Sequence, residues 1–413
     1  MNAIPLVLLG LGLEVCCLSL PWTGGDRLAS TVAILILSFL FYILAYYRYQ
    51  PPSGAGGSRP WVIAFALLFR LTLWPAEPRL SEDLYRYRWE ARVQAEGGNP
   101  YLARPNDAEW ASLRDETSPR IPAPDFRAGY GPLLELAQRC SFAVARAVSA
   151  DPATQTLWMK LPAALGDLGV LALLGRHPLL IVYAWNPLVL SEFAWSGHND
   201  ALVAFAVLAA WRRRSFGALG AAVALKWWPL ALAPALLRHV PWTRALAIPA
   251  ILALAAIPFI PPEPAELIEN ARFMSGFAGG WRNNDSLFGA VLWLAGGDMQ
   301  TAKYATFALM AAAVLGFARW PLERAWTATT AAILLLAANC HPWYVCWLVP
   351  LLAIGTPWPP LLLWTGLAPL SYSVLVKWRV LGEWDGSTPE RWWIYAPVFA
   401  AMAAWRVFAA KLH

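Results

Sequence analysis

The 413-residue chain is rich in hydrophobic residues (58%), poor in charged residues (14%), and has a mean hydropathy of +0.45. Soluble domains carry roughly 25% charged residues, so an ordinary soluble fold is excluded. The net charge of +6 does not indicate a nucleic-acid partner, because the arginines and lysines stand in small groups beside apolar runs, as anchors of membrane helices do.

Twelve apolar runs predict membrane-spanning helices. Each crossing needs about 20 apolar residues, and lipid cannot satisfy a bare peptide group, so long runs without period-2 alternation favour helices. The expected fold is an all-α, polytopic transmembrane bundle of about twelve spans, with residues 1–413 as a single membrane domain. The runs lie near residues 4–20, 28–47, 61–75, 131–149, 157–175, 199–211, 244–260, 302–319, 325–339, 343–355, 357–376 and 392–410.

Two further apolar stretches, 177–196 and 216–237, are interrupted at Asn186-Pro187 and Trp228-Pro229. Because proline removes a donor and breaks a helix, these stretches are predicted to be re-entrant hairpins shielded by protein. With both hairpins counted, all the basic groups fall on one face, which the positive-inside rule makes cytoplasmic. These groups are Arg48 with Arg59, Arg212 to Arg214, Arg238 with Arg244, Arg319 with Arg324, and Lys411.

The longest connection, residues 76–130, is then a large extracytoplasmic loop. An N-cap at Ser81 and a helix over 82–96 would align Leu84, Tyr87, Ala91 and Ala95 in one stripe, as in an interfacial amphipathic helix. Glu82 and Asp83 in its first turn either complement the helix dipole or supply a general base. Neighbouring side chains point about 100° apart on a helix, so both cannot easily face one substrate.

Further polar groups lie on the same predicted face. They include Gly197-His198-Asn199-Asp200, Trp281 to Ser286, and His341-Pro342-Trp343-Tyr344. Asn199 and Asp200 could equally cap a helix, and a metal site there lacks further ligands at suitable spacing. Lys160, Asp167 and Lys226 fall within apparent spans, where a charge is costly, so they are expected to face the protein interior, as functional or merely paired groups.

Taken in order, these motifs resemble the GT-C superfamily of membrane glycosyltransferases, especially the bacterial polyprenol-phosphate-mannose-dependent mannosyltransferases. The segment Ser81 to Tyr87, with Trp89-Glu90 and Gly98-Asn99-Pro100-Tyr101, is similar to the family's first-loop signature, in which an acidic residue acts in catalysis. Two departures stand out. Gly131 in Tyr130-Gly131-Pro132-Leu133 replaces a usual proline, and Glu90 stands where aspartate followed by glycine is commoner. Later matches are Asn186-Pro187, Gly197 to Asp200, Lys226-Trp227-Trp228-Pro229 and His341 to Tyr344.

The resemblance implies a helical bundle of GT-C type and an enzyme that transfers a hexose with inversion of configuration. That the hexose is mannose rests on the resemblance alone. The donor would be a polyprenyl-phosphate sugar and the acceptor a glycan or glycolipid, at the extracytoplasmic side of a bacterial plasma membrane, with no cofactor, metal or nucleic acid. Asp83 is the expected base and Glu82 the alternative, while Arg86, Arg272 and Arg282 are candidates for the lipid phosphate. The other expected substrate-binding residues are Tyr87, Asn99, Tyr101, Tyr130, His198, Asp200 and His341.

Two other classes of function remain open from the sequence. A transporter or flippase of a lipid-linked sugar would also use broken helices and charges near the membrane midplane, such as Asp167 and Lys226. The collection of polar groups in outer loops favours the enzyme. A non-catalytic assembly protein that retains a decayed enzyme fold is the third possibility.

Overall fold

The structure is a computed structural model. It describes residues 4–23, 27–49, 58–261, 263, 265–266, 281–382, 384 and 386–410. Every regular element in these residues is a helix, and the pairing of Asn283 with Asn339 and Gly386 is limited to isolated bridges. The predicted all-α class is confirmed.

The chain forms two compact units, each made from separate stretches of sequence. The first unit comprises Met1–Arg79, Leu171–Trp195 and Arg282–His413, and the second comprises Leu80–Val170 and Ser196–Trp281.

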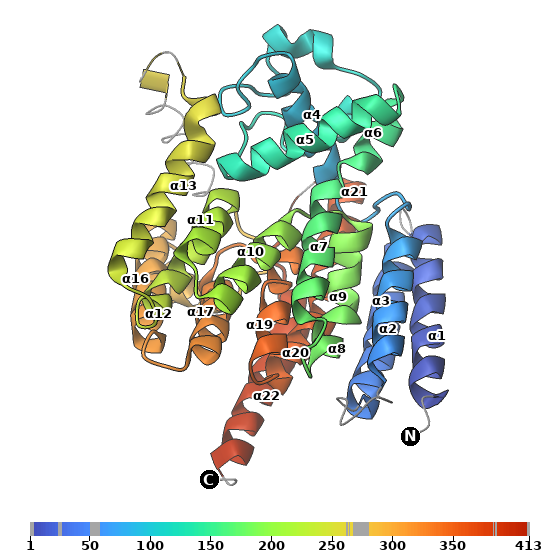
Figure 1. Ribbon diagram of the computed structural model, residues 1–413, viewed down its shortest axis with the longest axis vertical. Coiled ribbons are helices and arrows are strands. Elements are labelled where there is room, and N and C mark those ends of the chain that lie inside the picture. The colour runs from blue at the N-terminus through green and yellow to red at the C-terminus, as the bar shows by residue number, and fades with distance from the viewer. Residues whose placement is uncertain are drawn as a thin grey trace. The chain divides into compact units, whose positions relative to one another are not determined.

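In the first unit, α1 (Ile4–Ser19), α2 (Leu28–Arg48) and α3 (Arg59–Leu73) lie side by side (Figure 1). The buried residues of α1 include Leu6, Gly10, Leu13 and Cys17, which recur every three or four positions and therefore share one face. Leucine and valine side chains on the remaining surface of α1 are exposed. A helix with apolar residues on its packed and its open faces is suited to lipid.

The other helices of the first unit are mostly short. They are α8 (Leu180–Ala184), α9 (Pro187–Val189), a π-helix (Leu190–Trp195), α15 (Leu287–Leu294), α16 (Met299–Phe317), α17 (Leu322–Leu336), α18 (Pro342–Val345), α19 (Leu348–Ile354), α20 (Pro359–Leu367), α21 (Val374–Leu381) and α22 (Trp392–Ala410), with 3₁₀ turns at Leu20–Trp22, Ala368–Ser373 and Pro389–Arg391. The break predicted at Asn186-Pro187 is present. There the Asn186 side chain accepts the N–H of Leu188 at 3.0 Å and donates to Thr365 at 3.1 Å.

In the second unit, α4 packs on α5 and α6, and α11 packs on α10, α13 and α5. The chain also breaks as predicted near Trp228-Pro229, where α11 ends and a 3₁₀ turn begins. The bounds are α4 (Asp83–Ala95), α5 (Pro132–Val148), α6 (Pro152–Trp158), α10 (Asp200–Arg213), α11 (Phe216–Leu225), α12 (Ala233–Leu236) and α13 (Ala247–Ala256). The 3₁₀ turns lie at Ala108–Leu113, Ser118–Arg120, Trp228–Leu232, Trp242–Leu246 and Ile257–Phe259, and α7 (Leu161–Leu174) begins in this unit and ends in the other.

Helix α4 is buried on both sides. The predicted stripe is present, since Leu84, Tyr87 and Ala91 form a cluster with residues of α5 and the segment after α6. The opposite side is not the polar face expected of an amphipathic helix, because Tyr85, Trp89 and Val93 pack against residues of the loop that follows. The predicted cap is displaced by one residue: Glu82 occupies the N-cap, and the Ser81 hydroxyl accepts the N–H of Asp83 at 3.2 Å.

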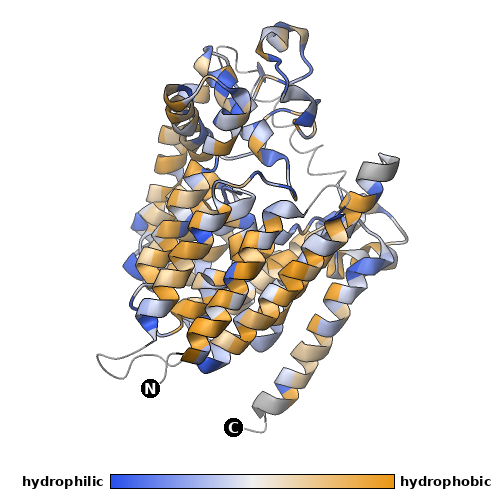
Figure 2. Cartoon of the chain, turned by 90° about the vertical axis from the view of Figure 1, so that its right-hand side faces the viewer, coloured by the Kyte–Doolittle hydropathy of each residue, from blue (hydrophilic) through white to orange (hydrophobic). Residues whose placement is uncertain are grey.

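Five helical segments of the described residues are long and apolar enough to cross a bilayer. Figure 2 shows that hydrophobic residues predominate along the long helices. The protein is therefore a multi-pass membrane protein. All twelve predicted runs coincide with helices, but the predicted count of spans is higher than five. Several of the helices are shorter than the roughly 20 residues that a crossing needs, as at Arg59–Leu73 and Asp200–Arg213. Another run is divided into two short helices, Pro342–Val345 and Leu348–Ile354. The five segments are Ile4–Trp22, Leu28–Arg48, Pro152–Leu174, Trp242–Phe259 and Pro359–Trp378.

Candidate active site

The first turn of α4 presents a carboxylate beside a buried histidine. Oδ2 of Asp83 lies 3.5 Å from Nδ1 of His198, and the Asp83 side chain is 22% exposed whereas that of His198 is fully buried. Asp83 lies in the first turn of α4, and the amino end of a helix favours a negatively charged side chain at this position. A carboxylate that reaches the surface and is held from behind by an imidazole suits a general base.

The adjacent carboxylate, Glu82, faces a different partner. Its Oε1 lies 3.1 Å from Nε of Arg120, and both side chains are well exposed. The Arg120 guanidinium lies 4.2 Å from the centre of the Tyr85 ring. Glu82 is therefore part of a surface ion pair, while Asp83 points to the buried histidine, as the divergence of neighbouring side chains on a helix requires.

A tight turn delivers His198 to this position. Gly197 has φ +74°, and a Cβ there would lie 2.7 Å from Cγ of the buried Lys160, so only glycine fits. The next residue, Asn199, is 1% exposed, and neither polar atom of its amide hydrogen-bonds a described residue. An unsatisfied buried amide is costly unless a ligand completes it.

A second charged pair stands next in the sequence. Both carboxylate oxygens of Asp200, in the first turn of α10, accept from Nζ of Lys226, at 2.7 and 2.8 Å. The same ammonium lies 5.5 Å from the centre of the Tyr130 ring, within range of a cation–π contact. The ion pair explains how Lys226, which the sequence places in an apolar stretch, is accommodated.

Two tyrosines complete this cluster. The rings of Tyr87 and Tyr130 meet edge to face, with centroids 5.5 Å apart and hydroxyl oxygens at 3.5 Å. Burial raises the pKa of Tyr87, and the negative charges of Asp83 and Asp200 raise it further. Tyr87 therefore keeps its proton and remains able to donate a hydrogen bond.

The segment carrying Tyr130 is held by backbone contacts. The N–H of Gly131 donates to the Leu225 carbonyl at 3.1 Å, and a Cβ on Gly131 would lie 2.2 Å from the Ala224 carbonyl oxygen. The proline that is usual at this position in the resembled family would lack this N–H and would not fit beside the Ala224 carbonyl. Glycine thus allows Tyr130 to approach Lys226, which follows Leu225.

Asn99 and Tyr101 support this segment from the loop after α4. The Tyr101 hydroxyl donates to the Tyr130 carbonyl at 2.8 Å, and burial raises the pKa of Tyr101. The Asn99 amide donates to the Phe259 carbonyl at 2.9 Å and accepts the Tyr101 N–H at 3.1 Å. Both side chains are thus engaged with the protein itself.

Arg86 is held by the protein on all three of its guanidinium nitrogens. It donates to Glu90 at 2.6 Å and to the carbonyls of Ala123 at 3.0 Å and Phe126 at 2.5 Å. Burial raises the pKa of Glu90, and the charge of Arg86 opposes this shift. Arg86 thus ties the loop after α4 to this helix. Its counter-ion is Glu90, the residue at which this sequence departs from the family pattern.

The remaining expected site residues belong to the first unit or lie outside the described residues. In the first unit, Arg282 pairs with Asp285 at 2.9 Å, and Nδ1 of His341 lies 3.0 Å from the Asn283 amide. The His341 ring stacks on Trp343, with centroids 4.2 Å apart and an interplanar angle of 7°. Arg272 lies outside the described residues.

The comparison with protein families decides the class of function. A model of the α-(1→6)-mannopyranosyltransferase N-terminal domain matches residues 14–257. The chain belongs to this family. No curated protein and no solved structure matches the chain.

This mannosyltransferase is therefore a glycosyltransferase of the polyprenyl-phosphate-mannose-dependent GT-C family, and the predicted resemblance is confirmed. Membership favours the enzyme over the transporter. The matched range contains the whole cluster of Asp83, His198, Asp200 and Lys226 in the second unit, but not His341.

Two residues that were not among the expected site residues, Asn199 and Lys226, lie beside them. The sequence placed both within motifs of the resembled family, and it left Lys226 open as a functional or merely paired charge and Asn199 as a helix cap. Their positions within these motifs could have indicated a role in the site. Asn199 stands between His198 and Asp200, and Lys226 is the first residue of the Lys-Trp-Trp-Pro segment.

Proposed function

We propose that this mannosyltransferase moves mannose from a polyprenyl-phosphate donor to a hydroxyl group of a glycan or glycolipid acceptor, in one inverting displacement at the extracytoplasmic side of a bacterial plasma membrane. The observation that carries the proposal is the contact of Asp83 with His198. Of the two adjacent carboxylates, Asp83 is exposed enough to meet a substrate, and its contact with His198 fixes its orientation.

In this reaction the acceptor oxygen attacks C1 of mannose while its proton passes to the Asp83 carboxylate. The bond between C1 and the phosphate oxygen breaks, and its electron pair stays on the lipid phosphate. A single displacement inverts the configuration at C1. Since the family name specifies an α-linked product, the donor linkage would be β.

The negative charge that develops on the lipid phosphate needs a fixed cation. We assign this role to Lys226, since Asp200 holds its ammonium in place through two hydrogen bonds. Arg86 is a weaker candidate, because its guanidinium already serves Glu90 and two carbonyls. Arg272 and Arg282 remain proposed phosphate ligands.

We assign acceptor or sugar contacts to Tyr87, Tyr130, His198 and Asn199. The amide of Asn199 supports this role, because it is buried without a partner among the described residues. His341 is proposed as a further substrate-binding residue, supported by its stacking on Trp343, since flat rings bind the apolar faces of sugars. Asn99, Tyr101 and Asp200 would act by positioning Tyr130 and Lys226.

The test is an Asp83→Asn variant, assayed as purified protein with a synthetic polyprenyl-phosphate mannose and a mannoside acceptor. Loss of the base should lower the rate of transfer by about 10²-fold or more. Glu82→Gln is the matched control, because Glu82 lies in the exposed pair with Arg120, and it should keep most of the activity. Full activity of Asp83→Asn, or loss of activity only in Glu82→Gln, would refute the assignment.

A further inference from the structure

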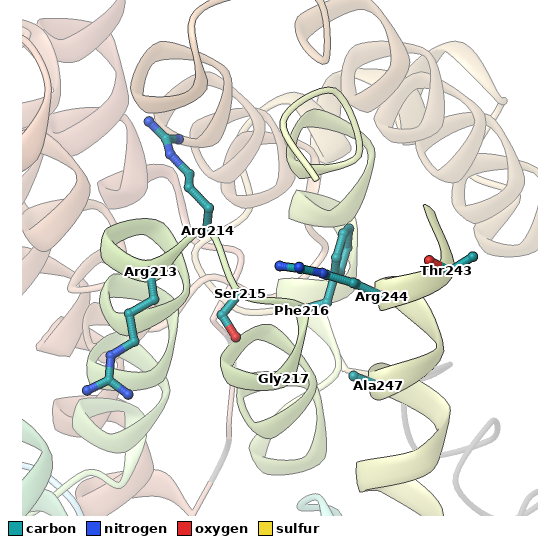
Figure 3. Close-up of a pocket in the computed structure, with 8 residues that line it drawn as sticks. All are labelled: Arg213, Arg214, Ser215, Phe216, Gly217, Thr243, Arg244 and Ala247. Atoms are coloured by element: carbon teal, nitrogen blue, oxygen red, sulfur yellow. The ribbon is translucent and has the colours of Figure 1, made fainter. Parts of the chain in front are cut away.

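A basic cavity lies at the turn between α10 and α11 of the second unit (Figure 3). Its volume is about 440 Å³, and its lining includes Arg213, Arg214, Ser215, Phe216 and Arg244. Arg214 has φ +49°, in the left-handed region that side chains other than glycine rarely adopt, and this turns the chain sharply between the two helices. None of the proposed site residues lines this cavity.

The lining carries three guanidinium groups and no acid. The side chains of Arg213 and Arg244 are exposed, and neither guanidinium has a hydrogen bond or ion pair with any residue that the structure describes. In Figure 3 the Arg244 side chain extends across the cavity toward Ser215 and Phe216, while Arg213 and Arg214 point to opposite sides of the turn. Like charges around one cavity repel each other, so an anion between them would be stabilised.

The amino end of α11 adds to this positive potential. Ser215 is the N-cap, and its hydroxyl accepts the N–H of Ala218 at 3.2 Å. The first N–H groups of a helix have no partner within the helix, and its dipole favours negative charge at this end. Together with the arginines, this end of α11 is suited to a phosphate group.

The position of the cavity indicates the source of that phosphate. Thr243, Arg244 and Ala247, which also line it, belong to the start of the candidate span Trp242–Phe259. Along this segment Leu246, Leu254 and Ile257 are 60%, 66% and 58% exposed. Their spacing of eight and three residues places them on one helical face.

The exposed strip has the length of a lipid chain in one leaflet. The eleven steps from Leu246 to Ile257 rise about 16 Å in an α-helix, and half of a bilayer's hydrocarbon core is about 15 Å. Trp242, at the same end as the cavity, is 70% exposed, as is usual for a tryptophan at the membrane–water boundary. A free phosphate ion would make no use of this strip.

We propose that this cavity is a binding site for an anionic phospholipid. The lipid phosphate lies between Arg213, Arg244 and the amino end of α11, and an acyl chain follows Leu246, Leu254 and Ile257. The site is separate from the mannosyl-transfer residues, so the lipid is a structural or regulatory ligand rather than the sugar donor.

The test is native mass spectrometry of the purified protein with phosphatidylglycerol or phosphatidylcholine of identical acyl chains. The anionic lipid should bind more tightly, and Arg213→Gln and Arg244→Gln should each weaken its binding about fivefold, with little effect on the zwitterionic lipid. The matched control is Arg324→Gln, which removes an exposed arginine outside the cavity and should leave binding unchanged.

Competition with inorganic phosphate separates the two sources of the anion. If the site recognises a lipid, inorganic phosphate should displace phosphatidylglycerol only at a much higher concentration than a second anionic lipid does. Displacement by inorganic phosphate as effective as that by lipid would overturn the lipid assignment. Equal binding by the wild type, Arg213→Gln and Arg244→Gln would overturn the site itself.

Discussion

At the scale of single residues, the candidate site is a set of charges that already have partners. Asp83 faces His198, and Lys226 is held by Asp200. Burying a charge costs less free energy when the charge has a partner, and the pairing fixes the geometry before a substrate binds. Asn199 differs from these residues, because it is buried but its amide meets no described partner.

Asn199→Ala therefore tests whether the amide serves a substrate or the fold. Removing an unsatisfied buried amide should change the free energy of unfolding by less than about 1 kcal/mol, whereas losing one hydrogen bond to the sugar should lower kcat/KM about tenfold. The measurements are thermal unfolding and mannosyl transfer. Asn106→Ala, in the exposed part of the loop, is the control and should be neutral in both; a large loss of stability in Asn199→Ala would contradict the prediction.

At the scale of elements, α4 is held by the loop that follows it. Asp115 accepts from Nη1 of Arg88 at 2.9 Å and from Nη1 of Arg92 at 2.5 Å. Burial tends to raise the pKa of Asp115, but hydrogen bonds from Thr117 and Arg88 outweigh it, so the pKa is lowered overall. The Arg88 side chain is 5% exposed, so its charge depends on this carboxylate.

Asp115→Asn should lower the free energy of unfolding by about 2 kcal/mol, because it leaves two guanidinium groups without their counter-charge. A lowered pKa stabilises the fold above the ordinary pKa of aspartate, and this contribution is lost as the pH falls through the folded-state value. The melting temperature of the wild type should therefore approach that of the variant below about pH 4. A constant difference between the two proteins down to pH 3 would contradict this.

The helices could be predicted from the sequence because their causes are local. Hydrophobic runs and prolines mark α1, α2 and the break at Asn186-Pro187 without reference to distant residues. The second buried face of α4 could not be predicted, since its cover comes from the long loop after it. The number of helices long enough to cross a bilayer could not be predicted either, because hydropathy shows neither where a helix ends within an apolar run nor how a run divides into shorter helices.

Within the site, the choice of Asp83 over Glu82 needed the structure, because both fit the motif equally well. The pairing of Arg86 with Glu90 could have been found from their spacing of four residues on a helix. The pairing of Asp200 with Lys226 could not, since it depends on how α10 and α11 pack. The requirement for Gly131 depends likewise on a carbonyl of α11.

At the scale of the whole molecule, the basic groups predict an orientation in the membrane that is open to a direct test. In a Cys140→Ser background, which removes the exposed native cysteine, Ala108→Cys and Arg324→Cys place thiols at exposed positions on opposite predicted faces. An impermeant thiol reagent added to intact cells should label position 108 only. Labelling of position 324 alone would reverse the orientation, and both should react after permeabilisation.

The discontinuous make-up of the first unit has a consequence for biosynthesis. Helix α2 packs on α20, where Phe39 lies against Gly366, yet the 310 residues from 49 to 358 separate the two helices. At roughly 5–20 residues per second, a ribosome needs roughly 15–60 s to supply that partner. During this interval the face of α2 that will meet α20 must rest against lipid or an insertion chaperone, so α2, although one of the first helices to be made, is among the last to complete its packing.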